Sequence, residues 1–380
     1  MDTSRKAYAV AIVIQLIYTG MFVVSKAAFD QGMNTYIFMF YRQAAGSLFL
    51  LPLALLLHRK NNVQSMSSWM LFKLFLSALI GITFSLNLYN VSLKFTSATV
   101  ASATDNSLPA VTFFLSLLLR MEDVKIKSAS GVAKVTGVTL CIAGVFAIAF
   151  YAGPSLSPVN HHHAFASNSS GSSGANITRG AWVKWTFLMV LANTTWSLWI
   201  VLQAGLFTVQ RTATLLKEYP NKILVTAAQC AFGTVQSFAV AVVAERDFSK
   251  WKLHFDVSLL AVFYAGFVVM GVAYYLQAWC VEMKDPVFLA AWTPLCFIFT
   301  IFCSSFFLGE RVHLGSIVGG ILLVGGLYSV LWGKSKEANI VSCDKVNKNN
   351  VPEDEHNNPA KHSNDKEQEG AISASTAEQV

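Results

Sequence analysis

Ten segments of the chain are each about 20 residues long and predominantly apolar, and they constrain the fold more than any other feature. The segments are residues 7–27, 36–57, 70–93, 98–119, 131–152, 181–207, 223–244, 257–278, 286–308 and 314–332. In lipid, only α-helices and closed β-barrels satisfy every backbone polar group, and these segments lack the alternating pattern of barrel strands. We therefore predict an all-α integral membrane protein with ten transmembrane helices, surrounded by the lipid bilayer.

The charge content agrees with a membrane protein and excludes several other classes. Charged residues make up 13% of the chain, whereas soluble domains contain about 25%. No basic run with interleaved aromatic residues lies outside the apolar segments, so we expect no nucleic-acid partner. The six cysteines form no CxxC pair, which argues against a disulfide framework and against a zinc site.

The distribution of Lys and Arg among the loops predicts the orientation. With a cytosolic amino terminus, thirteen basic residues fall in the inner loops and six in the outer loops, and both termini are then cytosolic. The loop at 245–256 is the exception, because it is basic but predicted to be non-cytosolic. No cleavable signal peptide is expected, because Arg5 and Lys6 lead directly into a full-length span. For the compartment we favour the plasma membrane, with the vacuolar membrane as the alternative.

Two segments outside the spans differ in composition. Residues 153–180 are rich in Ser, Asn, Gly and Pro and are predicted to form a flexible non-cytosolic loop. This loop contains glycosylation sequons at Asn168 and Asn176, and a histidine run at 161–163 that we interpret as solvated in preference to metal-binding. Residues 334–380 lack an apolar face and are predicted to be a disordered cytosolic tail.

An internal repeat appears when the chain is shifted by 188 residues without a gap. The identical pairs are Leu88/Leu276, Ala103/Ala291, Phe114/Phe302, Ser116/Ser304, Glu122/Glu310, Val124/Val312, Ser128/Ser316, Gly131/Gly319 and Gly137/Gly325. Each half contains five helices, and an odd number gives the two copies opposite orientations in the membrane, as in secondary transporters. Residues 1–152 and 181–333 are thus predicted to be inverted repeats. The alternative is a duplication kept only for folding.

Four stretches of the sequence resemble one plant family. They are Leu119-Arg-Met-Glu-Asp-Val124, Leu308-Gly-Glu-Arg-Val312, Ser97-Ala-Thr-Val-Ala-Ser-Ala-Thr-Asp-Asn-Ser-Leu-Pro109 and Leu327-Tyr-Ser-Val-Leu-Trp-Gly-Lys334. Over about residues 7–334 the chain is similar to the plant EamA-type transporters of the drug/metabolite transporter superfamily, called walls-are-thin-related, nodulin-like or UMAMIT proteins. The resemblance implies two inverted EamA repeats and facilitated movement of amino acids, or of auxin in some relatives. The chain departs from the usual pattern at Asp105, where the family more often has an uncharged residue.

Among the acidic residues before residue 334, only Asp105 lies well inside a predicted span. It is about 10 Å from the outer end of its helix at 1.5 Å per residue. A charge at this depth costs about 2.5 kcal/mol or more unless it faces water or a partner. We favour a functional role over a purely structural or protonated carboxyl group. Pro109 and Pro294 each remove a helical hydrogen bond and predict a helix break in each half.

The other predicted substrate-binding residues are polar or aromatic side chains within the spans. They are Asn106, Ser102, Asn87, Asn90, Trp196, Gln203, Tyr274, Gln277 and Thr293. Lys26 and Arg42 add cations near the ends of the first two helices, so the set holds acceptors for an ammonium group and donors for a carboxylate. Because polar side chains also join helices, a packing role remains the alternative for each residue. We interpret Glu122 and Glu310 as structural.

The leading hypothesis is a secondary carrier of neutral amino acids that works by alternating access, with export or bidirectional flux. Proton coupling through Asp105 is a further possibility, and transport of auxin or another aromatic acid or small metabolite is the alternative. An enzyme is not expected, because all eight histidines lie outside the spans or at their ends and no HExxH motif occurs. A receptor or scaffold would not need the inverted repeat. We expect no cofactor, no bound metal and no nucleotide-binding loop.

Overall fold

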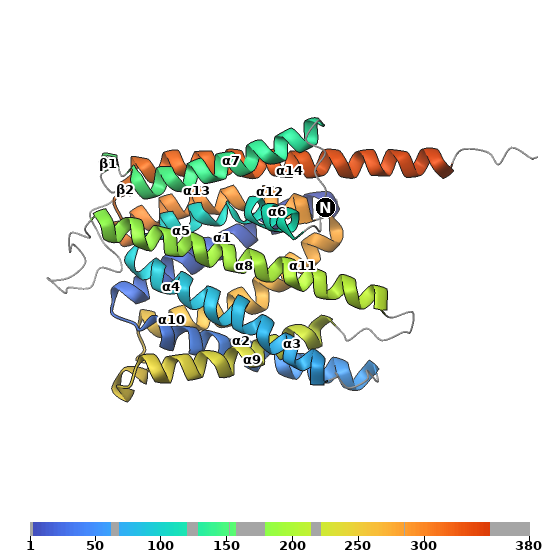
Figure 1. Ribbon diagram of the computed structural model, residues 1–380. Coiled ribbons are helices and arrows are strands. Elements are labelled where there is room, and N and C mark those ends of the chain that lie inside the picture. The colour runs from blue at the N-terminus through green and yellow to red at the C-terminus, as the bar shows by residue number, and fades with distance from the viewer. Residues whose placement is uncertain are drawn as a thin grey trace, which may run out of the picture. The chain divides into compact units, whose positions relative to one another are not determined.

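The computed structural model describes residues 3–61, 68–119, 128–151, 153–156, 179–213, 222–284 and 286–349. The chain divides into two units, Met1–Glu337 and Ala338–Val380, and the arrangement below concerns the first. Its helices lie side by side and cross the unit from one end to the other (Figure 1). This is the all-α membrane architecture that the ten apolar segments predict.

The first repeat contains helices that coincide with the first five predicted spans. They are α1 (Thr3–Asp30), α2 (Thr35–Asn61), α3 (Ser68–Ala78) continued by the π-helical segment η1 (Leu79–Ser85) and α4 (Leu86–Phe95), α5 (Ala98–Asp105) followed by α6 (Leu108–Leu118), and α7 (Ala129–Phe150). Serines begin two of these helices, because the Ser97 Oγ accepts the N–H of Val100 and the Ser128 Oγ accepts that of Gly131.

The second repeat follows the same plan. Its helices are α8 (Arg179–Ala213), α9 (Lys222–Ala244), the short 3₁₀ helix η2 (Phe248–Trp251), α10 (Val257–Phe263) continued by the π-helical segment η3 (Tyr264–Ala273) and α11 (Tyr274–Met283), α12 (Pro286–Ala291) followed by α13 (Thr293–Cys303) and the π-helical segment η4 (Ser304–Leu308), and α14 (Leu314–Asn349). Helices therefore lie at all ten predicted positions.

Among the described residues, eight helical stretches are long and apolar enough to cross a membrane, and α6 is a shorter apolar helix. Two of the ten predicted spans are not among these eight stretches, and each has a feature that explains the difference. Helix α2 carries the buried polar pair Arg42 and Gln43. The fourth span is divided into α5 and α6, neither of which reaches the length of a bilayer by itself.

The fifth helices of the two repeats run antiparallel, as inverted repeats require. Gly144 of α7 faces Gly319 of α14, and Gly137 faces Gly326, so the pairing descends along one helix as it ascends along the other. Figure 1 shows α7 and α14 side by side. Gly315 and Gly319 form a GxxxG motif, a pattern that permits close helix contact, and Gly319 contributes to this contact within the bundle.

Two short strands modify the prediction of a flexible 153–180 loop. Strand β1 (Ser155–Leu156) pairs antiparallel with β2 (Val312–His313). Gly153 turns the chain at a φ of 63°, and the N–H of Leu314 donates to the carbonyl of Pro154. Residues 157–178, with both sequons and the histidine run, lie outside the described residues.

The prediction of a disordered tail from residue 334 is wrong for its first part. Helix α14 continues to Asn349. The physical reason is that the sequence contains no Gly or Pro between Gly333 and Pro352, so nothing stops the helix at the end of the apolar span. Residues 350–380 lie outside the described residues.

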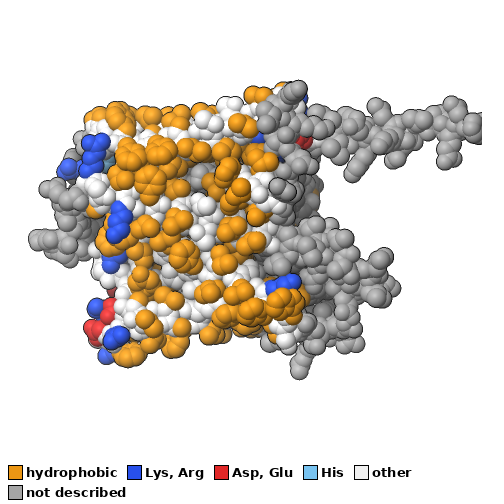
Figure 2. Space-filling model, viewed as in Figure 1, with side chains coloured by type: hydrophobic (Ala, Val, Ile, Leu, Met, Phe, Trp, Pro, Cys, Tyr) orange, Lys and Arg blue, Asp and Glu red, His pale blue; other side chains and the backbone are white. Residues whose placement is uncertain are grey.

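The surface of the unit matches a lipid environment. Large apolar side chains are widely exposed, among them Leu48, Trp69, Val235 and Phe302. Figure 2 shows hydrophobic side chains over much of one face, with most of the charged side chains in view at its left edge. In a soluble monomer, exposed apolar area of this extent would be exceptional.

The basic residues of the loop at 245–256 are neutralised by its own acids. The Lys250 ammonium lies 2.9 Å from a Glu245 carboxylate oxygen, which also accepts a hydrogen bond from the Asn34 amide at 3.0 Å. The hydrogen bond from Lys250 is the main cause that holds the pKa of Glu245 below its usual range. Its three acids, Glu245, Asp247 and Asp256, equal its three Lys and Arg residues in number, so the loop has no net formal charge with His254 neutral.

Candidate solute-binding site

A broken helix lies at equivalent places in the two repeats. In the first repeat α5 ends at Asp105 and α6 begins at Leu108, with Pro109 in its first turn. In the second, α12 ends at Ala291 and α13 begins at Thr293, followed by Pro294. The two broken helices pack together, because the Thr99 and Ser304 hydroxyls lie 3.1 Å apart. Irregular backbone at membrane depth is tolerated where it is buried in protein or lines a cavity.

Asp105 lies at the end of α5 and contacts a second helix. Its Oδ1 accepts a hydrogen bond from the Asn193 amide of α8 at 3.2 Å. The Tyr89 hydroxyl of α4 is buried and interacts electrostatically with the same carboxylate. The carboxylate is thus surrounded by neutral groups that have hydrogen-bonding capacity.

Arg42 is the centre of the second charged group. Its guanidinium interacts electrostatically with the hydroxyls of Tyr18, Tyr89 and Tyr274 and with the thiol of Cys230. Because Tyr89 interacts with both Arg42 and Asp105, the two charges belong to one neighbourhood. We call this set the central polar cluster: Tyr18, Arg42, Tyr89, Asp105, Asn193, Tyr274 and Gln277.

The central polar cluster draws on both repeats. Gln277 of α11 interacts with the Tyr18 hydroxyl of α1, and Tyr274 lies within electrostatic range of the same hydroxyl. The Cys296 thiol of α13 is close enough to interact with Tyr18 and Tyr89. Polar groups of the first repeat therefore face polar groups of the second, which is where inverted-repeat transporters place their substrate.

Two π-helical segments occupy corresponding positions beside the cluster. A shift of 188 residues places η1 (Leu79–Ser85) within η3 (Tyr264–Ala273). In η1 the hydroxyl of Thr83 donates to the Gln236 amide oxygen of α9 at 2.7 Å. π-helical turns are rare in proteins overall, but they occur often at functional sites. Their presence in both repeats therefore points to this depth of the bundle as the functional region.

Several predicted site residues are buried but bonded to their own helix. The Asn106 amide donates to the carbonyls of Ser102 and Ala103, and its Oδ1 is buried without a partner among the described residues. The amides of Asn87 and Asn90 donate to the carbonyls of Thr83 and Leu86. The amide N–H groups of these side chains already donate to carbonyls of the same helix. We therefore expect the residues to contribute to the site by their position more than by free N–H groups.

The remaining predicted residues are distributed differently. Trp196 packs on Trp199 with ring centroids 4.7 Å apart, and Trp199 lies against Gly81 of η1. Thr293 is half-buried at the start of α13. The side chain of Gln203 and all of Glu122 lie outside the described residues.

Sequence reasoning missed three members of the cluster, Tyr18, Tyr89 and Asn193. Tyr89 stands between the predicted Asn87 and Asn90, and tyrosine reads as an apolar or anchoring residue in a span. Asn193 is an amide within the apolar part of the sixth span, three residues before Trp196. A polar side chain in that setting was the signal that the sequence offered. Each becomes visible only when the helices are assembled.

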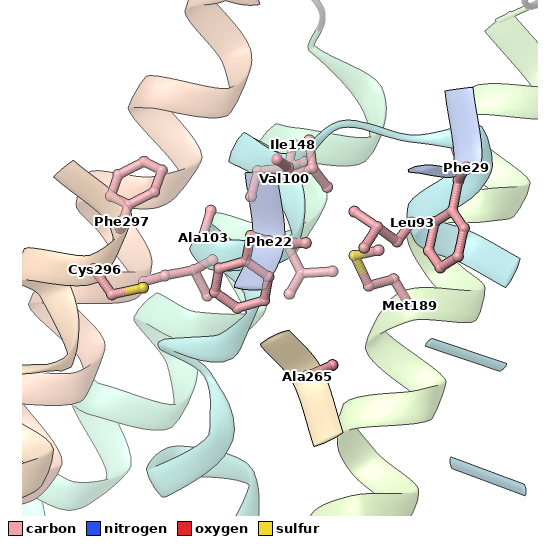
Figure 3. Close-up of a cluster of buried hydrophobic side chains, with 14 of the residues drawn as sticks. Phe22, Phe29, Leu93, Val100, Ala103, Ile148, Met189, Ala265, Cys296 and Phe297 are labelled. Carbon is pink, nitrogen blue, oxygen red and sulfur yellow. The ribbon is translucent and has the colours of Figure 1, made fainter. Parts of the chain in front are cut away.

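Apolar side chains pack between the two repeats, from Phe29 near the predicted outer end to Phe113 and Val330 nearer the inner end. Figure 3 shows part of this cluster, with Phe22, Leu93 and Val100 of the first repeat and Met189 and Cys296 of the second. At the predicted outer end the Glu310 carboxylate accepts the Ala98 N–H at the start of α5 at 3.1 Å. Burial raises the pKa of Glu310, and nearby Lys26 opposes that shift. Both contacts join one repeat to the other.

Within the described ranges, no group of three or more His, Cys, Asp or Glu residues is placed to hold a metal ion. The arrangement is instead suited to a small polar solute, with one acid, one guanidinium and several hydroxyl and amide groups between two inverted halves.

The fold and the site define a multi-pass membrane transporter, and comparison with known proteins specifies the family. Residues 5–150 and 183–332 match the EamA-like transporter family. The chain therefore belongs to that family, with one copy of the repeat in each half. It is a plant EamA-type transporter of the drug/metabolite transporter superfamily.

Relatives of known sequence agree over nearly the full length. A WAT1-related protein of Arabidopsis thaliana is 46% identical over 350 residues, which cover 90% of this chain and 94% of that protein. The Arabidopsis protein WALLS ARE THIN 1 is 36% identical over 339 residues, 88% of this chain and 85% of that protein. An auxin-induced protein of Pinus taeda is 34% identical over 368 residues, 94% of this chain and 86% of that protein.

A solved crystal structure shares the fold. It is 14% identical in sequence and superposes with a TM-score of 0.51 over 88% of this chain and 99% of that chain. At this identity the likeness concerns the arrangement of helices alone.

Proposed function

We propose that the protein carries amino acids across the membrane by alternating access, as a secondary transporter without direct use of ATP. The observation that supports this function is the central polar cluster, in which Asp105 and Arg42 lie between two inverted repeats with broken helices on both sides. A zwitterion needs acceptors for its ammonium group and donors for its carboxylate, and the cluster holds both kinds.

A contact at the predicted outer end supports the same mechanism. A carrier needs a closed barrier on one side of its substrate at any moment, and the Glu310–Ala98 hydrogen bond, which joins the two repeats, supports closure on the outer side. Rocking of one repeat against the other would exchange this barrier for one at the opposite end. We propose the plasma membrane as the location, with both termini cytosolic, and flux in either direction according to the gradient.

A second candidate is transport of an aromatic acid such as auxin. It is favoured by the three tyrosines of the cluster and by the packed pair Trp196 and Trp199, which offer aromatic surface beside the Arg42 guanidinium. An indole acid would use the guanidinium and the rings, but it has no ammonium group for Asp105.

Flux into liposomes that contain the purified protein tests both candidates. Radiolabelled leucine, glutamine and indole-3-acetate are compared, with protein-free liposomes as the control. Saturable flux of leucine or glutamine is the expected result. Saturable flux of indole-3-acetate alone supports the second candidate, and flux of none of the three refutes both.

A further inference from the structure

Arg42 is a buried cation to which no acid in the described part of the chain is paired. Its side chain and backbone together are 7% exposed. The guanidinium forms no ion pair or hydrogen bond with any described residue, and its Nε is fully buried without a partner. The other two buried cations of the described chain are both paired, Lys26 with Asp30 and Lys134 with Glu337.

The unpaired state of Arg42 calls for a ligand. Burial of an ionised group without a compensating charge is strongly unfavourable. The acid that the sequence places deep in a span, Asp105, is not within ion-pair distance of Arg42 and is bonded to Asn193 instead. A guanidinium presents a planar fork of donors that matches a carboxylate in a bidentate geometry.

The positions of Arg42 and Asp105 favour a ligand that carries two opposite charges. Arg42 is seven residues from the start of α2 at Thr35, and Asp105 is seven residues from the start of α5 at Ala98, so each lies about 10 Å along its helix from the predicted outer end. The Tyr89 hydroxyl is buried and interacts with both groups. The two charges and the hydroxyl thus form a set of opposite charges with a neutral group between them.

We propose that Arg42 binds the carboxylate of the transported solute and that Asp105 binds its ammonium group, with Tyr89 between the two. The ligand class is then the free α-amino acid, which requires both charges and neutralises both anchors in one binding event. The proposal rests on the proposed transport of amino acids. It adds that Arg42 and Asp105 each recognise a different charged group of the solute.

The test measures which part of the solute each anchor recognises. Inhibition of radiolabelled leucine flux in liposomes is compared for unlabelled leucine, for leucinamide, which lacks the carboxylate, and for 2-hydroxy-4-methylpentanoate, which lacks the ammonium group. Wild-type protein should prefer leucine over each analogue by about tenfold or more, since a charge-assisted hydrogen bond contributes about 1.5–3 kcal/mol. Arg42→Gln should lose the preference over leucinamide and keep that over the hydroxy acid. Asp105→Asn should show the reverse pattern.

Two further variants protect the test against a general loss of structure. Arg42→Lys keeps the charge but not the fork, and it should retain part of the preference over leucinamide. Ser47→Ala is the matched control, because Ser47 is a buried polar residue of the same helix whose hydroxyl is already paired with that of Thr234 at 2.8 Å. This variant should leave both preferences unchanged. Ligand-induced thermal stabilisation in detergent supplies the same comparisons for any variant whose flux is too low.

The outcomes separate the two proposals. Absence of saturable amino-acid flux in wild-type protein refutes the proposed function. Leucine flux in wild-type protein together with an unchanged preference over leucinamide in Arg42→Gln refutes the role of Arg42 while transport stands. Equal loss of both preferences in Arg42→Gln and in Ser47→Ala would also overturn the assignment, because the effect would then belong to the packing of α2.

Discussion

The seam between α7 and α14 allows a sharp test of the packing of the two repeats. A methyl group added at Gly326 would lie 2.6 Å from the Gly137 carbonyl oxygen and 2.5 Å from the Cys141 sulfur. Carbon and oxygen atoms in close contact are normally about 3.3 Å or more apart. Gly326→Ala therefore requires the two backbones to separate by several tenths of an ångström.

Overpacking of this kind costs about 1–3 kcal/mol. The upper part of that range is expected here, because one obstructing atom belongs to the backbone and cannot rotate away. The measurement is the melting temperature of the purified protein in detergent, followed by tryptophan fluorescence. We expect Gly326→Ala to lower it by several degrees.

Gly325 on the same helix supplies the control. A methyl group there meets nothing closer than a Leu140 methyl carbon at 3.9 Å, which is ordinary contact. Removal of a helix-interior glycine itself favours the helix by about 1 kcal/mol. Gly325→Ala should thus be neutral or stabilising. Equal destabilisation by both variants, or no effect of Gly326→Ala, would show that the seam is not packed as described.

Three other perturbations have defined outcomes. If Asp105 couples flux to protons, acidification of the outer solution should stimulate or bias leucine flux in liposomes, and Asp105→Asn should abolish the response; an unchanged pH profile in the variant excludes coupling through this residue. Burial raises the pKa of Glu310, so its ionisation destabilises the folded protein at pH values above the unfolded pKa. Glu310→Gln should then raise the melting temperature more at neutral than at mildly acidic pH, and a gain confined to acidic pH contradicts this sign. Glu337→Gln leaves the buried Lys134 ammonium unpaired and should cost about 1–3 kcal/mol, less than for a fully buried pair because Glu337 is partly exposed; chemical denaturation would report no change if the pair were unimportant.

The positions of the helices and the inverted arrangement of the two repeats could be predicted from the sequence, because both depend on patterns along the chain. A run of about 20 apolar residues has one stable form in lipid, and the spacing of Glu122 and Glu310 in the two halves fixes the repeat. The sequence also contains a signal for the extension of α14 to Asn349, the lack of Gly and Pro between Gly333 and Pro352, but the prediction relied on the polar composition of this segment. The pairing of Ser155 with His313 could not be predicted, because it is a contact between segments far apart in the chain.

The candidate site could be predicted from the sequence only in part, for a related reason. Asp105 is conspicuous because a charge inside a span is costly. Tyr18 and Asn193 gain their meaning from neighbours on other helices, Gln277 in one case and Asp105 in the other. That Arg42 has no ion-pair partner among the described residues is likewise a property of the assembled bundle, since the sequence shows the cation but not its surroundings.

The glycine seam has a consequence for motion. The central polar cluster contains no side chain from α7 or α14, and these two helices touch through backbone atoms at Gly144 and Gly319 and again at Gly137 and Gly326. Backbone contact resists sliding more than contact between flexible side chains does, because it leaves no rotamers to adjust. We expect the pair to act as the fulcrum on which the other helices tilt. Distances between spin labels placed across it should then stay constant while those across the substrate region change.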